Sequence, residues 1–291
     1  MFLFNNNNSL EPDITKILSS DVKKDLHIHT CYSDGDLTPQ QVVDKWLEEG
    51  FKLISITDHD GIEGSMSVMD YTAGMDIRIV SGTELDSACD LGSDIHIIGY
   101  GFDFNCPQLR SALLEIKLMR ARRNDMILQT LNSLGYNITL DDIGAINEGR
   151  YVGKPTFAAI LYRKGYTSDP QEAFRTVFRD PEMIRIRKET LSTKEAIDLI
   201  HQAGGVAVFA HPIEQRHPGE TFEAFIPRMY ELLDLMREYG VDGIEYRHPS
   251  ADEVQQKMLA EYADRHGLLK TEGSDFHSDM HQRNYSRYHR P

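Results

Sequence analysis

Residues 23–35, KKDLHIHTCYSDG, contain the pattern that organises the whole chain. We expect a buried strand over residues 22–27, with His27 and His29 at its end and Asp34 in the turn that follows. Side chains two positions apart on a strand point to the same face, so the two imidazoles should lie side by side. Imidazoles and carboxylates together are typical ligands of divalent zinc, iron or manganese. The stretch therefore predicts a strand that ends in metal ligands.

The same pattern recurs along the chain. Further strands are expected at 52–57, 77–82, 94–99, 205–210, 241–246 and 268–273, and most are followed or ended by a possible ligand. These residues are His59, Glu84, His96, His211, Asp275 and His277. Any one of them alone has a simpler explanation, such as a hydrogen-bonded core histidine or a turn-forming aspartate. Together they predict one cluster at the C-terminal ends of barrel strands, where catalytic sites are built.

Helices are expected between the strands. Thr38 with Gln41 and Ser192 with Glu195 have the spacing of capping boxes, and Gly267 ends a third amphipathic stretch. Strands that alternate with helices form parallel βαβ units, so we expect an α/β fold.

The stretch from 104 to 188 breaks the alternation, because it is nearly all helical in pattern. We expect residues 1–103 and 189–291 to form the barrel domain. Residues 104–188 would be a helical insertion that caps the substrate over the barrel mouth. Residues 1–20 are expected to be a poorly ordered leader, and the tail at 278–291 a disordered segment.

Composition excludes several classes of protein. The formal charge is −15 and the pI is near 5.2, which disfavours long nucleic acids as partners. Apolar runs are too short to span a bilayer, so no membrane partner is expected. No secretory signal is visible, and three cysteines without C-x-x-C spacing fit a reducing compartment, so we expect a cytoplasmic protein. The oligomeric state is left open.

The motifs DLHIHTCYSDG, ITDHDGIEG, GTEL, HIIGY, AHP and GSDFH resemble those of the PHP (polymerase and histidinol phosphatase) superfamily of metal-dependent phosphoesterases. The branch most similar removes phosphate from small nucleotides or cyclic ribose phosphates. The resemblance implies a distorted (β/α)7 barrel with two or three divalent ions of Mn, Fe or Zn. It implies a first ion on His27, His29, Glu84 and Asp275, a second on Glu84, His96 and His211, and a third on Asp34, His59 and His277.

The implied chemistry is hydrolysis of a phosphate ester by a metal-bound hydroxide, with Asp275 and His211 as catalytic residues. Three divalent ions would outweigh the charge of the three ligand carboxylates, so the site should attract an anion. Asp58 and Asp60 flank His59 and are candidates to orient imidazoles, although solvated surface acids are a comparable interpretation.

Four further residues are candidates for binding the small phosphorylated substrate. Arg122 lies on the expected long helix and Lys154 at a Gly-Lys-Pro turn, while Arg247 and His248 follow the strand at 241–246. A solvated basic helix face is the alternative for Arg122. Alternative functions are a short-oligonucleotide 5′-exonuclease, a histidinol phosphatase, and a sensor that retains the metal cluster without catalysis.

Overall fold

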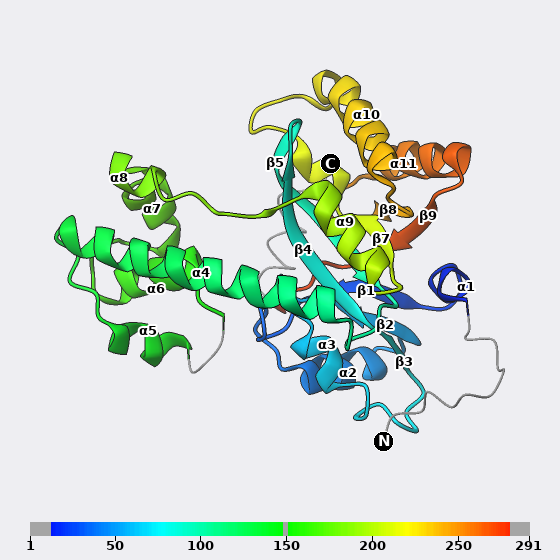
Figure 1. Cartoon of the computed structure of the whole chain (residues 1–291), viewed down its shortest axis with the longest axis horizontal. Helices are drawn as coiled ribbons and strands as arrows, with labels where there is room; N and C mark the ends of the chain where they lie inside the picture. Colours follow the sequence, from blue (N-terminus) through cyan, green and yellow to red (C-terminus); the bar gives the residue numbers. More distant parts are fainter. Residues whose placement is uncertain (1–12, 148–150, 280–291) are drawn as a thin grey trace.

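The structure is a computed structural model that describes residues 13–147 and 151–279. It is a mixed α/β fold, as expected, with helices packed around two sheets (Figure 1). The smaller sheet is parallel and has the order β1-β2-β3, and the larger has the order β6-β4-β5-β7-β8-β9. The strands are β1 Lys24–Ile28, β2 Leu53–Ile56, β3 Arg78–Val80, β4 Gly82–Cys89, β5 Gly92–Tyr100, β6 Leu191–Ser192, β7 Val206–Phe209, β8 Gly243–Arg247 and β9 Leu269–Glu272.

The expectation that all strands are parallel is wrong for one part of the larger sheet. β4 and β5 form an antiparallel hairpin, and β5 also runs antiparallel to β7. Only Asp90 and Leu91 separate β4 from β5, and a connection this short can join antiparallel strands but not parallel ones. The strand expected at 77–82 is consequently divided between β3 and β4. Glu84 and His96 lie inside strands of the hairpin rather than at strand ends.

Two isolated bridges join the sheets where the ligand residues gather. Ile28 at the end of β1 bridges Phe276, which follows β9, and His59 after β2 bridges Glu84 in β4. The main-chain hydrogen bonds here are short: His29 N lies 2.9 Å from Phe276 O, and Asp60 N lies 2.8 Å from Glu84 O. These bridges bring residues from β1, β2, β4 and β9 to one place.

The capping predictions are confirmed. Capping boxes begin α2 (Pro39–Glu48) at Thr38 and α9 (Thr193–Gln202) at Ser192, and α11 (Glu253–His266) ends at Gly267 in the left-handed conformation. The remaining helices of this part are α3 (Glu63–Ser67) and α10 (Phe222–Tyr239). Part of the expected leader is ordered: α1 (Ile14–Leu18) forms because Leu18 is buried in a cluster with Leu26 and Tyr100. The rest of the leader, residues 1–12, and tail residues 280–291 lie outside the described residues.

The stretch 104–188 is helical, as expected. It contains α4 (Pro107–Ser133), α5 (Leu140–Asn147), α6 (Lys154–Arg163), α7 (Pro170–Arg175), the 3-10 turn η1 (Val177–Arg179) and α8 (Pro181–Ile184). Figure 1 shows α4 running from the sheets to the group of α5–α8 at one side of the molecule. Leu109 and Leu113 at the start of α4 belong to the main core, whereas Ile127 and Leu131 near its end pack with Phe157 of α6 in a second core. The division into two domains stays a prediction.

Two simpler expectations can also be compared with the structure. Among residues 13–147 and 151–279, no helix is both long and apolar enough to cross a membrane. No disulfide bond joins the three cysteines, Cys31, Cys89 and Cys106, which all lie among the described residues.

Candidate metal centre

Four ligand atoms from three separate parts of the chain converge at the end of β1. Nε2 of His27 lies 3.1 Å from Nε2 of His29, and both nitrogens face Oε2 of Glu84 at 3.3 Å. Oδ1 of Asp275 lies 3.4 Å from the first nitrogen and 3.1 Å from the second. Four atoms at these separations describe a small cage, formed by the side chains that were expected to hold the first ion.

The second oxygen of Glu84 takes part in a neighbouring group. Oε1 lies 3.0 Å from His96 Nδ1 and 3.1 Å from His211 Nε2, and these two nitrogens are 3.3 Å apart. His96 reaches this position because β5 runs back along β4, opposite Asp86 in the register of the hairpin. Glu84 therefore places one oxygen in each of two adjacent groups, the arrangement expected for a carboxylate that bridges two ions.

The third group is wider. His277 Nε2 lies 3.3 Å from Asp34 Oδ1, and His59 Nε2 lies 3.9 Å from Asp34 Oδ2. His29 also approaches this group, with Nδ1 at 3.7 Å from Asp34 Oδ1. The main-chain oxygen of Asp275 accepts a hydrogen bond from His277 Nδ1 at 2.9 Å, so the other nitrogen of His277 faces Asp34.

These residues fit divalent ions by two criteria. Bonds of about 2.0–2.1 Å in a tetrahedral site place ligand atoms roughly 3.3–3.4 Å apart, close to the separations in the first group. In addition, Glu84 Oε2 is buried without a hydrogen-bond partner among the described residues. Buried polar atoms without partners are costly, and an ion would satisfy them. The donor set and spacing are those of a centre for divalent transition metals.

The protonation of the metal-free cluster reflects the same convergence. Burial alone would raise the pKa of Glu84, but the positive charges of His27, His59 and His96 hold it well below its ordinary value. Burial likewise lowers the pKa of His29, but its pairing with Asp275 and Glu84 outweighs burial and raises that pKa to about 10. His29 therefore holds a proton at neutral pH when no metal is bound.

Sequence reasoning missed a buried carboxylate behind the first group. Glu245 in β8 is fully buried, and its Oε1 lies 3.0 Å from Nδ1 of His27. Its Oε2 accepts a hydrogen bond from the main-chain N–H of His211 at 2.9 Å. A carboxylate on the outer nitrogen of a ligand histidine fixes its tautomer and orientation. The signal was available, because a glutamate inside an otherwise apolar buried strand needs a partner.

Gly273 makes room for this contact. A Cβ at Gly273 would overlap the Cβ of His27 and would lie 2.8 Å from Oε1 of Glu245. Asp25 holds the neighbouring backbone in place, because its carboxylate accepts hydrogen bonds from Ser274 N at 2.9 Å and from Trp46 Nε1 at 2.8 Å. The end of β9 is therefore fixed against β1, and this places Asp275 next to His27.

Arg247 at the end of β8 and His248 after it have different surroundings. His248 is buried, and its Nε2 lies 3.3 Å from Oδ2 of Asp275 while its Nδ1 accepts a hydrogen bond from Ser250 N at 3.1 Å. His248 therefore contacts the oxygen of the Asp275 carboxylate that does not face His27 and His29. Arg247 pairs with Glu272 at 2.8 Å, and its contacts in the described chain include none with the ligand cluster. His248 is thus turned away from solvent whereas Arg247 is exposed, and their role as substrate contacts stays a prediction.

The two aspartates beside His59 are buried, so they are not solvated surface acids. Asp58 accepts hydrogen bonds from Thr30 N, Thr30 Oγ1 and Ser33 Oγ, each at 2.7 Å, and so holds the loop that carries Asp34. Asp60 pairs with Arg120 of α4, and burial together with Asp86 raises the pKa of Asp60 to about 6. Neither aspartate contacts a ligand imidazole in the described contacts.

The backbone is unusual at three positions of this region. Asp60, His211 and Asp275 are the non-glycine residues with positive φ among the described residues, at 49°, 28° and 49°. Such conformations cost of order 1–3 kcal/mol each and tend to occur at functional sites. Two of the three are predicted ligands, and the third follows a ligand.

The basic residues of the helical stretch differ in their surroundings, and the role of Arg122 and Lys154 in substrate binding stays a prediction. Arg122 is exposed, because two residues correspond to about 200° around a helix and so place it opposite the side of α4 that carries Arg120. Arg123 is partly buried, and its Nε has no hydrogen-bond partner in the described chain. Burial lowers the pKa of Lys154, and Arg123 lowers it further. Lys154 also lies over the ring of Phe178, 5.7 Å from its centroid.

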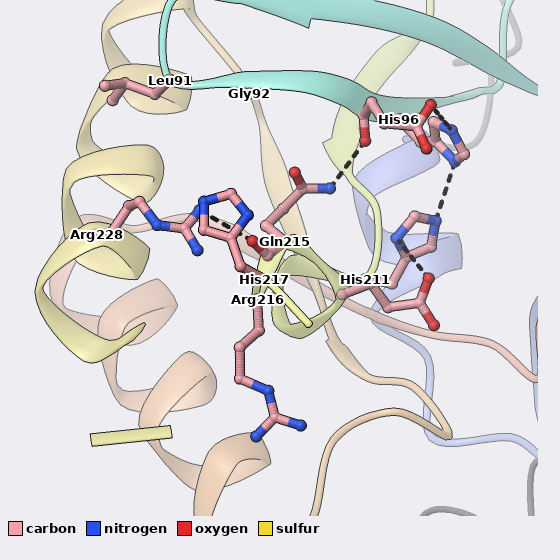
Figure 2. Close-up of a pocket in the computed structure, with 10 residues that line it drawn as sticks. Leu91, Gly92, His96, His211, Gln215, Arg216, His217 and Arg228 are labelled. Atoms are coloured by element: carbon pink, nitrogen blue, oxygen red, sulfur yellow. Dashed lines mark hydrogen bonds and ion pairs between the residues drawn. The ribbon is translucent and has the colours of Figure 1, made fainter. Parts of the chain in front are cut away.

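A pocket of about 210 Å³ opens beside the second group (Figure 2). His96 and His211 face each other on one side of this pocket, and Arg228 and His217 lie on the other. Arg228 is held by Glu220 at 2.6 Å and by the main-chain oxygen of Gln215 at 2.9 Å.

An α/β fold with this cluster of imidazoles and carboxylates defines a metal-dependent phosphoesterase, a hydrolase. The chain belongs to the PHP domain family, whose family model matches residues 25–281. The 3′,5′-nucleoside bisphosphate phosphatase of Chromobacterium violaceum is 31% identical over 257 residues, which cover 87% of this chain and 87% of that protein.

Two further comparisons agree with this membership. The 5′-3′ exoribonuclease of Haemophilus influenzae is 29% identical over 255 residues, which cover 88% of this chain and 90% of that protein. The solved structure of a metal-dependent phosphoesterase of Bifidobacterium adolescentis superposes with a TM-score of 0.73 at 29% identity, and the match covers 89% of each chain.

Proposed function

We propose that the protein hydrolyses a phosphate ester of a small phosphorylated ribose or nucleotide. The substrate would be a nucleoside bisphosphate that loses its 3′-phosphate, or a cyclic ribose phosphate. The observation that carries the proposal is Glu84, whose two oxygens belong to two adjacent ligand groups at 3.0–3.3 Å. Two metal ions held this closely are the usual clamp for phosphoryl oxygens in hydrolytic enzymes.

The centre would hold two or three divalent ions of Mn, Fe or Zn in the three groups described above. When bound, such ions lower the pKa of a coordinated water toward neutrality and neutralise charge on the phosphoryl group. Neighbouring side chains of the protein hold the ligand side chains in position. Glu245 orients His27, and His248 holds the second oxygen of Asp275. Asp275 would thereby combine ligation with proton transfer, and His211 would act beside it on the second group.

An anion site for a second, uncleaved phosphate is part of the proposal. Arg123 lies near enough to Lys154 to add to the lowering of its pKa by burial, and Arg123 forms no ion pair with an acid in residues 13–147 and 151–279. Positive groups brought together without a counter-ion favour binding of an anion. The 3′,5′-nucleoside bisphosphate phosphatase among the relatives supports a substrate with two phosphoryl groups.

A substrate panel tests the proposed function. After removal and replacement of metal, kcat/KM would be compared for an adenosine 3′,5′-bisphosphate, a ribose 1,2-cyclic phosphate, histidinol phosphate, p-nitrophenyl phosphate and a short 5′-phosphorylated RNA. We expect one of the first two to be the best substrate by at least an order of magnitude. A preference for histidinol phosphate would contradict the proposal.

Lys154→Ala tests the second anion site in the same assay. A charge-assisted hydrogen bond contributes about 1.5–3 kcal/mol, so its loss should lower kcat/KM for the bisphosphate roughly 10- to 100-fold. The loss for p-nitrophenyl phosphate should be much smaller, since this substrate has one phosphoryl group. Arg122→Ala is the matched control on the exposed face of α4. Equal losses on both substrates would mean that Lys154 does not bind a second phosphate.

A 5′-exonuclease acting on short oligonucleotides is the second candidate. The exoribonuclease relative favours it, as does the pocket beside His96 and His211, which has Arg216 and His217 in its lining. If this candidate is correct, the RNA substrate should exceed both small molecules, and Arg216→Ala should weaken RNA hydrolysis without affecting p-nitrophenyl phosphate.

A further inference from the structure

Asp86 is a buried acid that lies outside the nine expected ligands. It follows Glu84 by two positions in β4, so both side chains project from the same face of the strand. Asp86 is 5% exposed, and its main-chain N–H donates to Oδ1 of Asp60 at 3.1 Å. A buried carboxylate needs partners that offset its desolvation, and the partners of Asp86 show what it does.

The two oxygens of Asp86 have different neighbours. Oδ2 pairs with Nζ of Lys188, in the segment that leads from α8 back to the sheets. Oδ1 lies 3.1 Å from Nδ1 of His59 and 3.3 Å from Nε2 of His96. This oxygen and His59 Nδ1 are both buried without a hydrogen-bond partner in the described part of the chain. One carboxylate oxygen thus faces two imidazoles that the centre uses.

The remaining nitrogen of each imidazole points to a different ligand group. His59 Nε2 faces Asp34 in the third group, and His96 Nδ1 faces Glu84 in the second. Each ring therefore has one nitrogen toward a ligand group and the other toward Asp86, and His59 Nδ1 also lies 3.2 Å from Oε2 of Glu84. We propose that Asp86 is a positioning residue that fixes the tautomer and orientation of His59 and His96 and so couples two ion sites.

Lys188 lies on the side of Asp86 that is turned away from the imidazoles. Its side chain is 35% exposed, and it contacts the one oxygen of Asp86 that does not face the imidazoles. A buried carboxylate needs a partner for each oxygen, because an unpaired buried polar atom is costly. With Lys188 on Oδ2, the other oxygen stays available to both. The chain that leaves the helical stretch is thereby linked to the geometry of the metal centre.

The inference rests on the multi-ion centre of the proposed function but not on the substrate. Asp86→Asn should leave the number of bound ions per chain unchanged at saturating Zn²⁺, because Asp86 is not a ligand. It should weaken binding of two of the ions on the order of 10- to 100-fold, the usual effect of removing the carboxylate behind a ligand histidine. The measurement is competition of metal-free protein with a chromophoric chelator, with ion content by elemental analysis.

Asp94→Asn is the matched control. Asp94 faces the same His96 nitrogen at 3.6 Å but is 76% exposed, so the same substitution should change metal affinity less than about threefold. The visible spectrum of the Co²⁺-loaded protein adds a readout of ligand geometry, and it should change in Asp86→Asn and not in Asp94→Asn. Neither measurement involves a substrate, so a failure here is distinct from a failure of the substrate panel.

Three results would overturn the proposal. The first is unchanged affinity in folded Asp86→Asn, and the second is loss of a whole equivalent of metal at saturation, which would make Asp86 a ligand. If Asp86→Asn fails to fold because Lys188 is left unpaired, Asp86→Asn/Lys188→Met removes both charges and should restore folding. The affinity defect must persist in that double variant, and wild-type affinity there is the third overturning result.

Discussion

Glu245→Gln tests whether a buried carboxylate outside the ligand set supports the metal centre. The wild-type oxygens serve two separate donors, Nδ1 of His27 at 3.0 Å and the main-chain N–H of His211 at 2.9 Å. Glutamine has nearly the same shape but only one oxygen. Its NH₂ group must therefore face one of these donors, and that donor loses its partner.

The expected magnitude follows from the burial of the site. A buried donor left without an acceptor costs about 1–3 kcal/mol. Loss of the carboxylate behind a ligand histidine typically weakens metal binding by about 10- to 100-fold, or roughly 1.4–2.7 kcal/mol. The two ranges agree, so we expect the dissociation constant of the first ion to rise by one to two orders of magnitude.

The assay is a titration of metal-free protein with Zn²⁺ against a competing chelator, with thermal unfolding of the same sample to check the fold. Glu214→Gln is the control, because Glu214 Oε2 lies 3.6 Å from His211 Nδ1 on a side chain that is 34% exposed. It should change the affinity less than about threefold. Wild-type affinity in folded Glu245→Gln, or an equal loss in both variants, would refute the reasoning.

Three other outcomes are expected. Glu84→Ala or Asp275→Ala should abolish phosphoester hydrolysis while the chain remains folded, because the ion cage loses a ligand; turnover at the wild-type rate would contradict the assignment. Gly273→Ala should weaken metal binding, since the new Cβ meets His27 and Glu245, whereas Gly144→Ala, with open space around it, should stabilise α5 by about 0.5–1 kcal/mol in denaturant titrations. His29, with its pKa raised to about 10, stabilises metal-free protein fully below about pH 6.5, and that contribution is lost as the pH rises through about 10. Metal binding should release protons and stabilise the protein more at pH 8 than at pH 6, which unfolding curves with and without metal would measure.

Many residues of the candidate site could be predicted because they lie close in sequence to recognisable strand and helix boundaries. The pair His27 and His29 and the pair Asp275 and His277 each lie at the end of a predicted strand, and strand ends meet at one edge of a sheet. Helix starts such as Thr38 were also predictable, since a capping box is contained within four residues.

The features that were missed depend on contacts between distant parts of the chain. The sequence did not show that β4 continues to Cys89, within two residues of β5, and its pairing with β5 and that of β5 with β7 define this antiparallel part of the sheet. Glu245 was hidden because its partner His27 is 218 positions away in the sequence. Arg120 and Arg122 are equally basic in sequence, and only the packing of α4 determines that Arg120 meets Asp60.

The positive φ angles at Asp60, His211 and Asp275 lower the stability of the fold at residues in or next to the metal centre. Glycine adopts these angles without strain, so replacing these three residues with glycine is an obvious strategy to stabilise the fold. At His211 and Asp275 that change would delete a ligand along with the strain. Thermostable variants of this protein should therefore be sought among positions remote from these turns, because here the chain is held in an unfavourable shape for the benefit of its chemistry.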